Sequence, residues 1–231
     1  MSEINLIYFD ILPSTNTYAK ENINTLELPS LIIANGQTAG RGRQGKSFFS
    51  PYDTGLYMTL VFEAPQNYSL ITPAAAVAVC NVLEKYGINP KIKWVNDIFI
   101  DNHKICGILT ECFSSNQKLY IALGIGINLT TAVFPDDLKI AGSINIDYDK
   151  KLLASEISKS ILGYINYPDS SYIISEYRYR LFIINKQITF SKNNIQYFAT
   201  VKDINENCNL IVETENGTTE ILSSGEISIK I

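Results

Sequence analysis

A glycine-rich segment, residues 35–55, separates two strand-like runs and leaves no room there for a helix or a strand. It holds five glycines and one proline. The run before it, 31–34, is Leu-Ile-Ile-Ala and is typical of a short buried strand, while the alternating apolar residues of 56–62 predict a strand with one buried face. Because glycine and proline both interrupt regular structure, we interpret 35–55 as a loop. The chain therefore folds around a long loop between two strands.

The same loop contains two of the four arginines of a chain that has fifteen lysines. They are Arg41 and Arg43, which alternate with glycines in the run GRGRQG at 40–45. Arginine presents a planar fork of donors that matches carboxylate and phosphate oxygens. Glycines allow backbone N–H groups to approach an anion. We therefore interpret this run as an anion-binding loop, with a flexible surface loop as the alternative.

The run from Gly40 to Ser47 also has the spacing of a nucleotide-binding P-loop, GxxxxGKS. That motif needs a strand that leads directly into the loop and a helix that leaves it. Here five residues separate Gly40 from the preceding strand-like run, and the residues after Ser47 are poor helix formers interrupted by Pro51 and Gly55. The match in letters therefore does not indicate a P-loop.

The rest of the chain divides into a part that mixes helices with strands and a tail made of strands alone. The expected strands are 4–12, 92–100, 104–113 and 118–127, and the expected helices begin after Ser14 and cover 72–86, 150–166 and 170–183. The tail, 187–231, has short strands separated by Asn and Gly turns, which favours a small β-barrel. The predicted fold class is α+β, with one domain at 1–185 and a second at 186–231.

Charge and hydropathy exclude several classes of protein. The net charge of −4 and the pI near 5.1 argue against general binding to nucleic acids or anionic membranes. The longest apolar runs are far shorter than the roughly 20 residues of a membrane-spanning helix. The first ten residues lack the basic and apolar regions of a signal peptide. We expect a globular chain in the cytoplasm.

Cysteine and histidine are too few for several kinds of chemistry. The four cysteines include no CxxC pair, so a zinc site is not expected. Cys106 and Cys112 lie in an apolar context and are interpreted as buried free thiols in a reducing compartment. The single histidine, His103, sits in a predicted turn, which disfavours a hydrolase that depends on a Ser-His or Cys-His pair.

Two further runs place charge or glycine inside predicted strands. Lys104 leads directly into the apolar run 105–109, where a buried lysine is costly unless an anion pairs with it. Lys93 is open to a second interpretation, a solvated lysine at a sheet edge. Gly124 and Gly126 remove side chains from one face of a strand, which fits either close packing of another segment or contact with a ligand.

Six motifs occur in one order along the chain, and together they are highly specific. They are Ser14-Thr15-Asn16, GRGRQG at 40–45, KWVND at 93–97, KICGIL at 104–109, GIGIN at 124–128 and GEIS at 225–228. In this set the chain resembles the biotin protein ligases, or biotin–[acetyl-CoA-carboxylase] ligases, over essentially its whole length. The resemblance implies a catalytic domain with a mixed sheet and flanking helices, related to class II aminoacyl-tRNA synthetases, followed by an SH3-like C-terminal domain.

The resemblance also implies a reaction. Biotin and ATP form biotinyl-5′-AMP with Mg²⁺, and the biotinyl group then passes to a lysine of a biotin carboxyl carrier domain. The enzyme would be a monomer or a homodimer. Two alternatives remain: a lipoate or octanoate ligase of the same superfamily, and a catalytically inactive sensor of biotin or a nucleotide.

The resemblance assigns a role to each residue of these motifs. Arg43 and Lys104 would be catalytic and bridge the carboxylate and the α-phosphate, and Asp97 would assist a magnesium ion. Biotin would contact Ser14, Thr15, Asn16, Gln37, Gly40, Arg41, Gly42, Arg43, Lys104 and Gly107. ATP would contact Arg43, Lys46, Phe48, Lys93, Asn96, Lys104 and Asn128.

The chain departs from the family pattern at three of these positions. Val95 stands where proline is usual, Phe48 where tryptophan is usual, and Lys46 where arginine is frequent. Since neither of the first two changes removes a charge, we expect altered stiffness and stacking and not lost chemistry. Lys46 should still meet phosphate, as a point charge without the bidentate fork of arginine. Members that also act as repressors carry an N-terminal helix-turn-helix domain. The catalytic motifs here begin at Ser14, so no DNA-binding role is expected.

Overall fold

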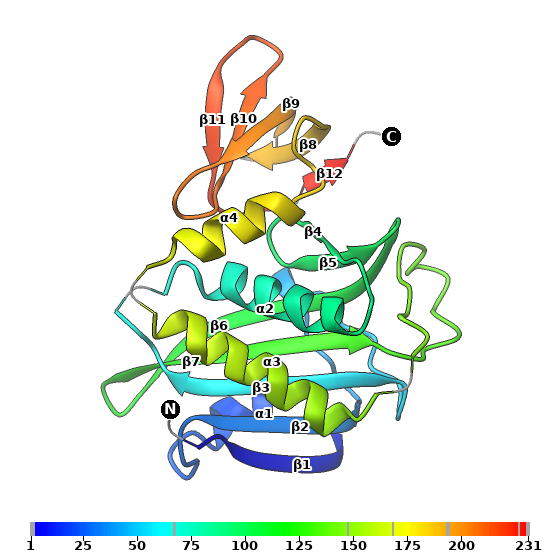
Figure 1. The fold of residues 1–231 in the computed structure, drawn as a ribbon, viewed down its shortest axis with the longest axis vertical. Coiled ribbons are helices and arrows are strands. Elements are labelled where there is room, and N and C mark those ends of the chain that lie inside the picture. Colours follow the sequence, from blue (N-terminus) through cyan, green and yellow to red (C-terminus); the bar gives the residue numbers. More distant parts are fainter. Residues whose placement is uncertain are drawn as a thin grey trace.

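The structure is a computed structural model that describes residues 3–66, 68–146, 148–167, 169–192, 195–225 and 227–229. Glu226 of the GEIS motif lies outside these ranges. Within them the chain forms two β-sheets and four α-helices. Figure 1 shows the larger sheet with its helices in one part of the molecule and the smaller sheet at the opposite end.

The larger sheet has seven strands and is mixed, as expected. Its strands are β1 (Asn5–Leu12), β2 (Ser30–Gln37), β3 (Gly55–Glu63), β4 (Lys91–Lys93), β5 (Asp97–Ile100), β6 (His103–Ser115) and β7 (Lys118–Asn128). Their order is β1-β2-β3-β7-β6-β5-β4. β1 and β2 run parallel, and each other neighbouring pair is antiparallel.

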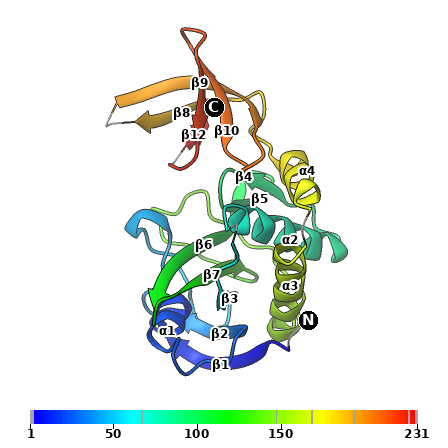
Figure 2. The ribbon, with the colours of Figure 1, turned by 90° about the vertical axis from the view of Figure 1, so that its left-hand side faces the viewer.

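Helices cover both faces of this sheet. α2 (Ile71–Lys85) and α3 (Lys150–Ile165) lie on one face, and the short α1 (Thr15–Glu21) lies on the other (Figure 2). α1 begins as predicted, because the Ser14 side chain accepts a hydrogen bond from the backbone N–H of Thr17 and caps the helix. α4 (Ser171–Arg180) packs between α2 and the smaller sheet (Figure 1).

The core explains one departure from the sequence prediction. We expected β3 to have one buried face, yet its first eight residues are all buried. β3 lies inside the sheet, where α3 contacts it from one face and α1 from the other, and its Tyr57 packs against the glycine-rich loop. Alternation of polar and apolar residues reports burial only when one face is solvated.

The predicted strand 92–100 is wrong, because the chain turns back in its middle. Residues 94–96 form a turn between β4 and β5, and Lys93 pairs with Asp97 across it. The peptide bond between Trp94 and Val95 is cis. The expected strand 31–34 is also too short, since β2 continues to Gln37 beside β1.

The smaller sheet is open and is not the closed barrel that the tail predicted. Its strands are β8 (Gln187–Lys192), β9 (Ile195–Ile204), β10 (Leu210–Thr214), β11 (Thr219–Leu222) and β12 (Ile227–Ile229). They pair antiparallel in the order β11-β10-β9-β8-β12. The two edge strands, β11 and β12, have only four and three residues and each pairs with one neighbour. This arrangement fits an SH3-like domain.

The cysteines correct one further expectation. All four are free thiols, and Cys80, Cys106 and Cys208 are buried, but Cys112 is exposed. α2 begins over β6 at Thr72, whose hydroxyl lies 2.7 Å from that of Thr110. Cys112 lies on the same face of β6 beyond the start of the helix, so nothing from α2 covers it. In the part of the chain that the structure describes, no helix is long and apolar enough to cross a membrane.

Candidate active site: a cationic cleft on the larger sheet

A cavity of about 450 Å³ lies on the sheet face opposite α2 and α3, between the glycine-rich loop and strands β6 and β7. Fifteen of the sequence-predicted site residues line it: Ser14, Thr15, Asn16, Gln37, Arg41, Gly42, Arg43, Lys46, Phe48, Lys93, Asn96, Asp97, Lys104, Gly107 and Asn128. Gly40 does not line it. Its carbonyl accepts a hydrogen bond from the backbone N–H of Phe48 within the loop.

One end of the cavity is lined by amide and hydroxyl groups. Gln37 Oε1 accepts hydrogen bonds from the Thr15 backbone N–H at 2.9 Å and from the Thr15 hydroxyl at 3.2 Å. Gln37 Nε2 donates to the Ser50 hydroxyl at 2.9 Å. Asn16 Oδ1 accepts from the Thr59 hydroxyl at 2.5 Å. This end therefore presents oriented donors and acceptors in place of an apolar wall.

Glu111 of β6 stabilises that polar end, although it belongs to none of the sequence motifs. Its carboxylate accepts from Asn16 Nδ2 at 2.9 Å, pairs with Lys20 at 2.8 Å and receives two nitrogens of Arg41 at 3.0 and 3.2 Å. Burial raises the pKa of Glu111, but hydrogen bonds from Lys20 and Asn16 and both positive charges lower it overall. The carboxylate stays ionised and ties the glycine-rich loop to the sheet. One charged side chain in the run LTECF, at 109–113, was the available signal.

The glycines of β7 make room for side chains, as the close-packing alternative predicts, and both also line the cavity. A Cβ on Gly126 would lie 2.4 Å from the Phe48 ring, and a Cβ on Gly124 would lie 2.2 Å from Asn16 Oδ1. Gly107 pairs with Gly126 across the two strands, also under the Phe48 ring. The strand pair forms a flat floor for the loop and for α1.

Two of the cations are held by groups on the other side of the cavity. Arg43 Nη1 donates to Asn96 Oδ1 at 3.0 Å, and its Nη2 donates to the carbonyl of Gly225 at 3.4 Å. Lys104 Nζ forms an ion pair of 2.7 Å with Asp97. Gly225 lies just before β12, so the C-terminal part of the chain contributes a wall of the cavity. The sequence assigned no role to that carbonyl.

Lys46, Lys93 and Arg41 bring the number of cationic side chains that line the cavity to five. Lys93 also lies 5.9 Å from the centre of the Phe99 ring. Among the residues that the structure describes, two carboxylates, Asp97 and Asp137, line the same cavity. Since the cations outnumber the carboxylates, the cleft is positive in a chain whose net charge is −4, and an anion is the complementary ligand.

Asn128 adds an acceptor that faces the cavity. Its side chain is 5% exposed, and its Nδ2 donates to the carbonyl of Gly142 at 3.0 Å. Among the described residues its Oδ1 has no hydrogen-bond partner. A buried acceptor without a donor is costly, which suits a site that a ligand donor completes.

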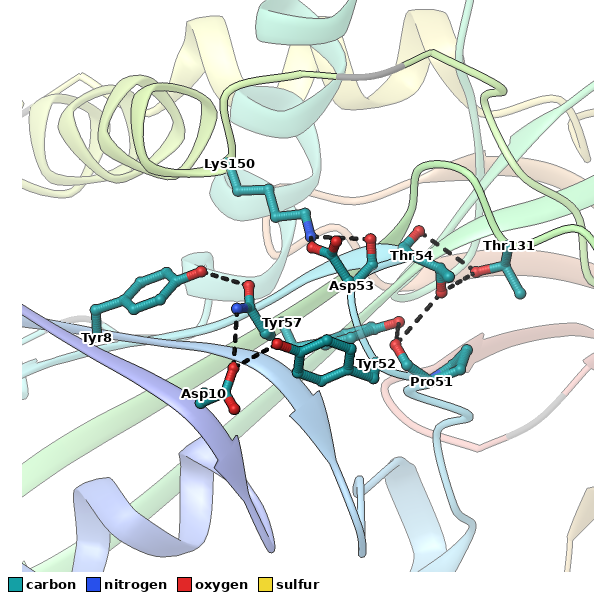
Figure 3. A network of polar contacts seen from close by, with 10 residues as sticks. Tyr8, Asp10, Pro51, Tyr52, Asp53, Thr54, Tyr57, Thr131 and Lys150 are labelled. Carbon is teal, nitrogen blue, oxygen red and sulfur yellow. Dashed lines mark hydrogen bonds and ion pairs between the residues drawn. The ribbon is translucent and has the colours of Figure 1, made fainter.

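A polar network anchors the end of the glycine-rich loop to the elements around it (Figure 3). The Tyr52 hydroxyl donates to Asp10 of β1 at 2.7 Å, and Asp53 pairs with Lys150 of α3 at 2.5 Å. The Thr54 hydroxyl lies 2.9 Å from that of Thr131. The loop therefore leaves the cavity at a fixed point. No helix follows it, as expected for a chain without a P-loop.

The described ranges contain no group of three side chains that could hold a metal ion. Asp97, the sequence-predicted magnesium residue, is paired with Lys104. A carboxylate in that position orients the lysine before any ligand binds.

Comparisons with known proteins agree with this geometry. Residues 8–128 match the Biotin/lipoate A/B protein ligase family, and residues 183–230 match the Biotin protein ligase C terminal domain. The bifunctional ligase/repressor BirA of Bacillus subtilis is 38% identical over 68% of this chain and 51% of its own length. The biotin–[acetyl-CoA-carboxylase] ligase of Mycobacterium tuberculosis is 27% identical over 85% of this chain and 77% of its own. The chain spans about half the length of the Bacillus protein.

The fold has solved counterparts. The biotin protein ligase of Aquifex aeolicus, solved in complex with biotin and ATP, superposes with a TM-score of 0.85 at 24% identity and with 98% of both chains covered.

Proposed function

The chain belongs to the biotin/lipoate A/B protein ligase family, and on that basis we propose that it is an ATP-dependent ligase that attaches biotin to a lysine of a carrier protein. The observation that carries the proposal is the convergence of five cationic side chains on one cavity whose other end is lined by amides and hydroxyls. Such a cavity suits a ligand pair that has a neutral polar head and several anionic groups.

In the first step a carboxylate oxygen of biotin attacks the α-phosphorus of ATP. The bond from that phosphorus to the bridging oxygen of the β-phosphate breaks, and pyrophosphate leaves with the electron pair. Because the step brings two anions together, fixed cations lower its barrier. Arg43 and Lys104 are proposed for this task, since Asn96 and Asp97 already hold them in place.

In the second step the amine of a carrier lysine attacks the acyl carbon of biotinyl-5′-AMP. The bond from that carbon to the phosphate oxygen breaks, AMP leaves, and the nitrogen loses a proton to water. Arg43 and Lys104 would stabilise the departing phosphate as they stabilised the first transition state.

The two ligands would divide the cavity between them. The proposed biotin contacts are Ser14, Thr15, Asn16, Gln37, Arg41, Gly42, Arg43, Lys104 and Gly107, all of which line the cavity. The proposed ATP contacts are Arg43, Lys46, Phe48, Lys93, Asn96, Lys104 and Asn128. The Asn128 Oδ1 atom suits the amino group of adenine, because that group is a donor. Mg²⁺ would enter with ATP, and Asp97 would bind it only by giving up its pair with Lys104.

The polar end favours biotin over an acyl chain. A ureido group offers two N–H donors and a carbonyl acceptor, which match the acceptors and donors of Asn16, Gln37 and Thr15. An alkyl chain in the same place would offer these groups neither donors nor acceptors, so it would gain no hydrogen bond from a polar lining.

We extend the proposal to the setting of the enzyme. The acceptor would be a biotin carboxyl carrier domain of the acetyl-CoA carboxylase type, and the reaction would take place in the cytoplasm. The catalytic domain would be 1–185 and the C-terminal domain 186–231. The break falls between α4 and β8, where the larger sheet and its helices end.

The test is isotope exchange between pyrophosphate and ATP, run with biotin, with lipoate and with neither. Exchange that depends on biotin supports the first step. Exchange that depends on lipoate would assign the chain to the other branch of the family. Folded protein that shows no exchange with either acid would indicate a sensor.

A further inference from the structure

Two buried side chains, one in α4 and one in the turn itself, fix the turn at 94–96. The hydroxyl of Tyr177 in α4 donates to the carbonyl of Val95 at 2.9 Å. Trp94 Nε1 donates to the carbonyl of Cys208, in the smaller sheet's β9–β10 connection, at 2.9 Å. Tyr177 is 0% exposed and Trp94 is 5% exposed. Both contacts come from parts of the chain far from the turn in sequence.

The front of the same turn reaches Arg43. Asn96 accepts the Arg43 hydrogen bond through Oδ1, and its Nδ2 donates to the carbonyl of Ile108 at 2.9 Å. The carbonyl of Asn96 in turn accepts from the Ile108 backbone N–H at 3.0 Å. Asn96 is therefore fixed to β6 and orients the guanidinium, so a shift of the turn would move Arg43.

Tyr177 meets the requirements of a permanent donor. Burial raises the pKa of its phenol well above the ordinary value, so the hydroxyl keeps its proton across the neutral range. Tyr177 is not one of the described residues that line the cavity. Its hydroxyl contacts the turn through the Val95 carbonyl and does not face a ligand directly.

We propose that Tyr177 is a positioning residue for Arg43, which it serves by holding the Val95 carbonyl and with it the Asn96 amide. The kinetic part of this inference rests on the proposed function, whereas the contact itself does not. Through this contact α4 fixes the position of the Arg43 guanidinium, which lies on the sheet face opposite α2 and α3.

The first test is Tyr177→Phe, which removes one oxygen and keeps the buried ring. We expect kcat for biotin-dependent exchange to fall about tenfold, the scale of one lost hydrogen bond. KM for biotin should change less than kcat, because most of the proposed biotin contacts lie at the polar end of the cavity and not at Arg43. The control is Tyr164→Phe, whose hydroxyl accepts from Asn81 Nδ2 at 2.8 Å on the helical side of the sheet. It should keep the wild-type kcat.

A double-mutant cycle separates positioning from general stability. If Tyr177 acts through Asn96, adding Tyr177→Phe to Asn96→Ala should lower kcat less than about twofold further. A further tenfold loss in that background would overturn the inference. An unchanged kcat in Tyr177→Phe alone would overturn it as well.

A measurement without turnover keeps the inference testable if the wild type shows no exchange, the result that would reject the proposed function. Trp94 is the only tryptophan of the chain, so its fluorescence reports on the turn. Acrylamide should quench Trp94 more strongly in Tyr177→Phe than in the wild type or in Tyr164→Phe. Equal quenching in all three proteins would contradict the proposed hold on the turn.

Discussion

At the scale of single residues, Lys104 is the cation whose loss should cost most activity. Its ion pair with Asp97 places the ammonium group in the cleft before ligands bind. Lys104→Ala should keep the fold and lower the rate of adenylate formation by about 10²- to 10³-fold, the usual loss for one preorganised transition-state contact. Pyrophosphate–ATP exchange at saturating biotin and ATP measures this rate. The control is Lys118→Ala in β7, which removes an exposed ion pair with Glu63 of β3. It should leave the rate of adenylate formation unchanged.

Glu111 predicts a pH dependence of stability at the same scale. Its folded-state pKa is lowered, so the ionised carboxylate stabilises the fold above the unfolded value of about 4.3. That contribution disappears as the pH falls through the lowered folded-state pKa. Glu111→Gln should therefore reduce the free energy of unfolding at pH about 7 and make it less dependent on pH below about 5. Urea titrations at several pH values measure this. If the free energy of unfolding of the variant depended on pH as steeply as that of the wild type, the role of Glu111 would be contradicted.

Glu63→Gln is the matched control for that experiment. Glu63 is exposed, at 57% of its side chain, and pairs only with Lys118 among the described residues. Its removal should change stability by less than about 1 kcal/mol at any pH.

At the scale of elements, the same substitution should have opposite effects in β7 and α3. Gly126→Ala places a methyl group 2.4 Å from the Phe48 ring, so the loop must move away from the floor. Binding of ATP should weaken by at least about tenfold, or 1.4 kcal/mol. Gly163→Ala in α3 meets no atom within 4 Å and should stabilise the fold by about 0.5–1 kcal/mol without affecting binding. Calorimetry of binding and of unfolding gives both values. Unchanged ATP affinity in Gly126→Ala would contradict the inference that the glycines of β7 make room for Phe48 in the ATP site.

Element patterns also show how far the sequence predicts this fold. Periodicity and capping residues located β1, α1 and α2 because each signal is local, such as Ser14 before α1. The turn at 94–96 was missed, since apolar residues lie on both sides of Asn96 and Asp97 and no glycine or proline marks the reversal. β3 is buried on both faces only because helices from distant parts of the chain cover it.

The candidate site divides in the same way. Motif residues such as Arg43 and Lys104 were predicted because their types and spacing carry the chemistry. Glu111 and the carbonyl of Gly225 were missed, since one is a single carboxylate in a strand and the other is backbone that any residue supplies. Their roles arise from tertiary contacts that no local pattern contains.

At the scale of the whole molecule, the two sheets should respond together to ligands. Arg43 contacts Gly225 near β12, and Trp94 contacts the Cys208 carbonyl, so the smaller sheet holds residues next to the site from two directions. Biotin and ATP, each at about 100 times its dissociation constant, should each raise the free energy of unfolding by about 2.7 kcal/mol.

Hydrogen exchange can locate that stabilisation within the molecule. Since the contacts with Gly225 and Cys208 link the smaller sheet to the cleft, ligands should slow amide exchange in β9 and β10 as well as in β6 and β7. An exposed hairpin that lacks these links, the turn between β10 and β11, serves as the internal reference and should exchange at the same rate with and without ligands. Slowing confined to the larger sheet would mean that the two sheets are energetically independent. In that case the carbonyls of Gly225 and Cys208 would touch the site without stabilising it.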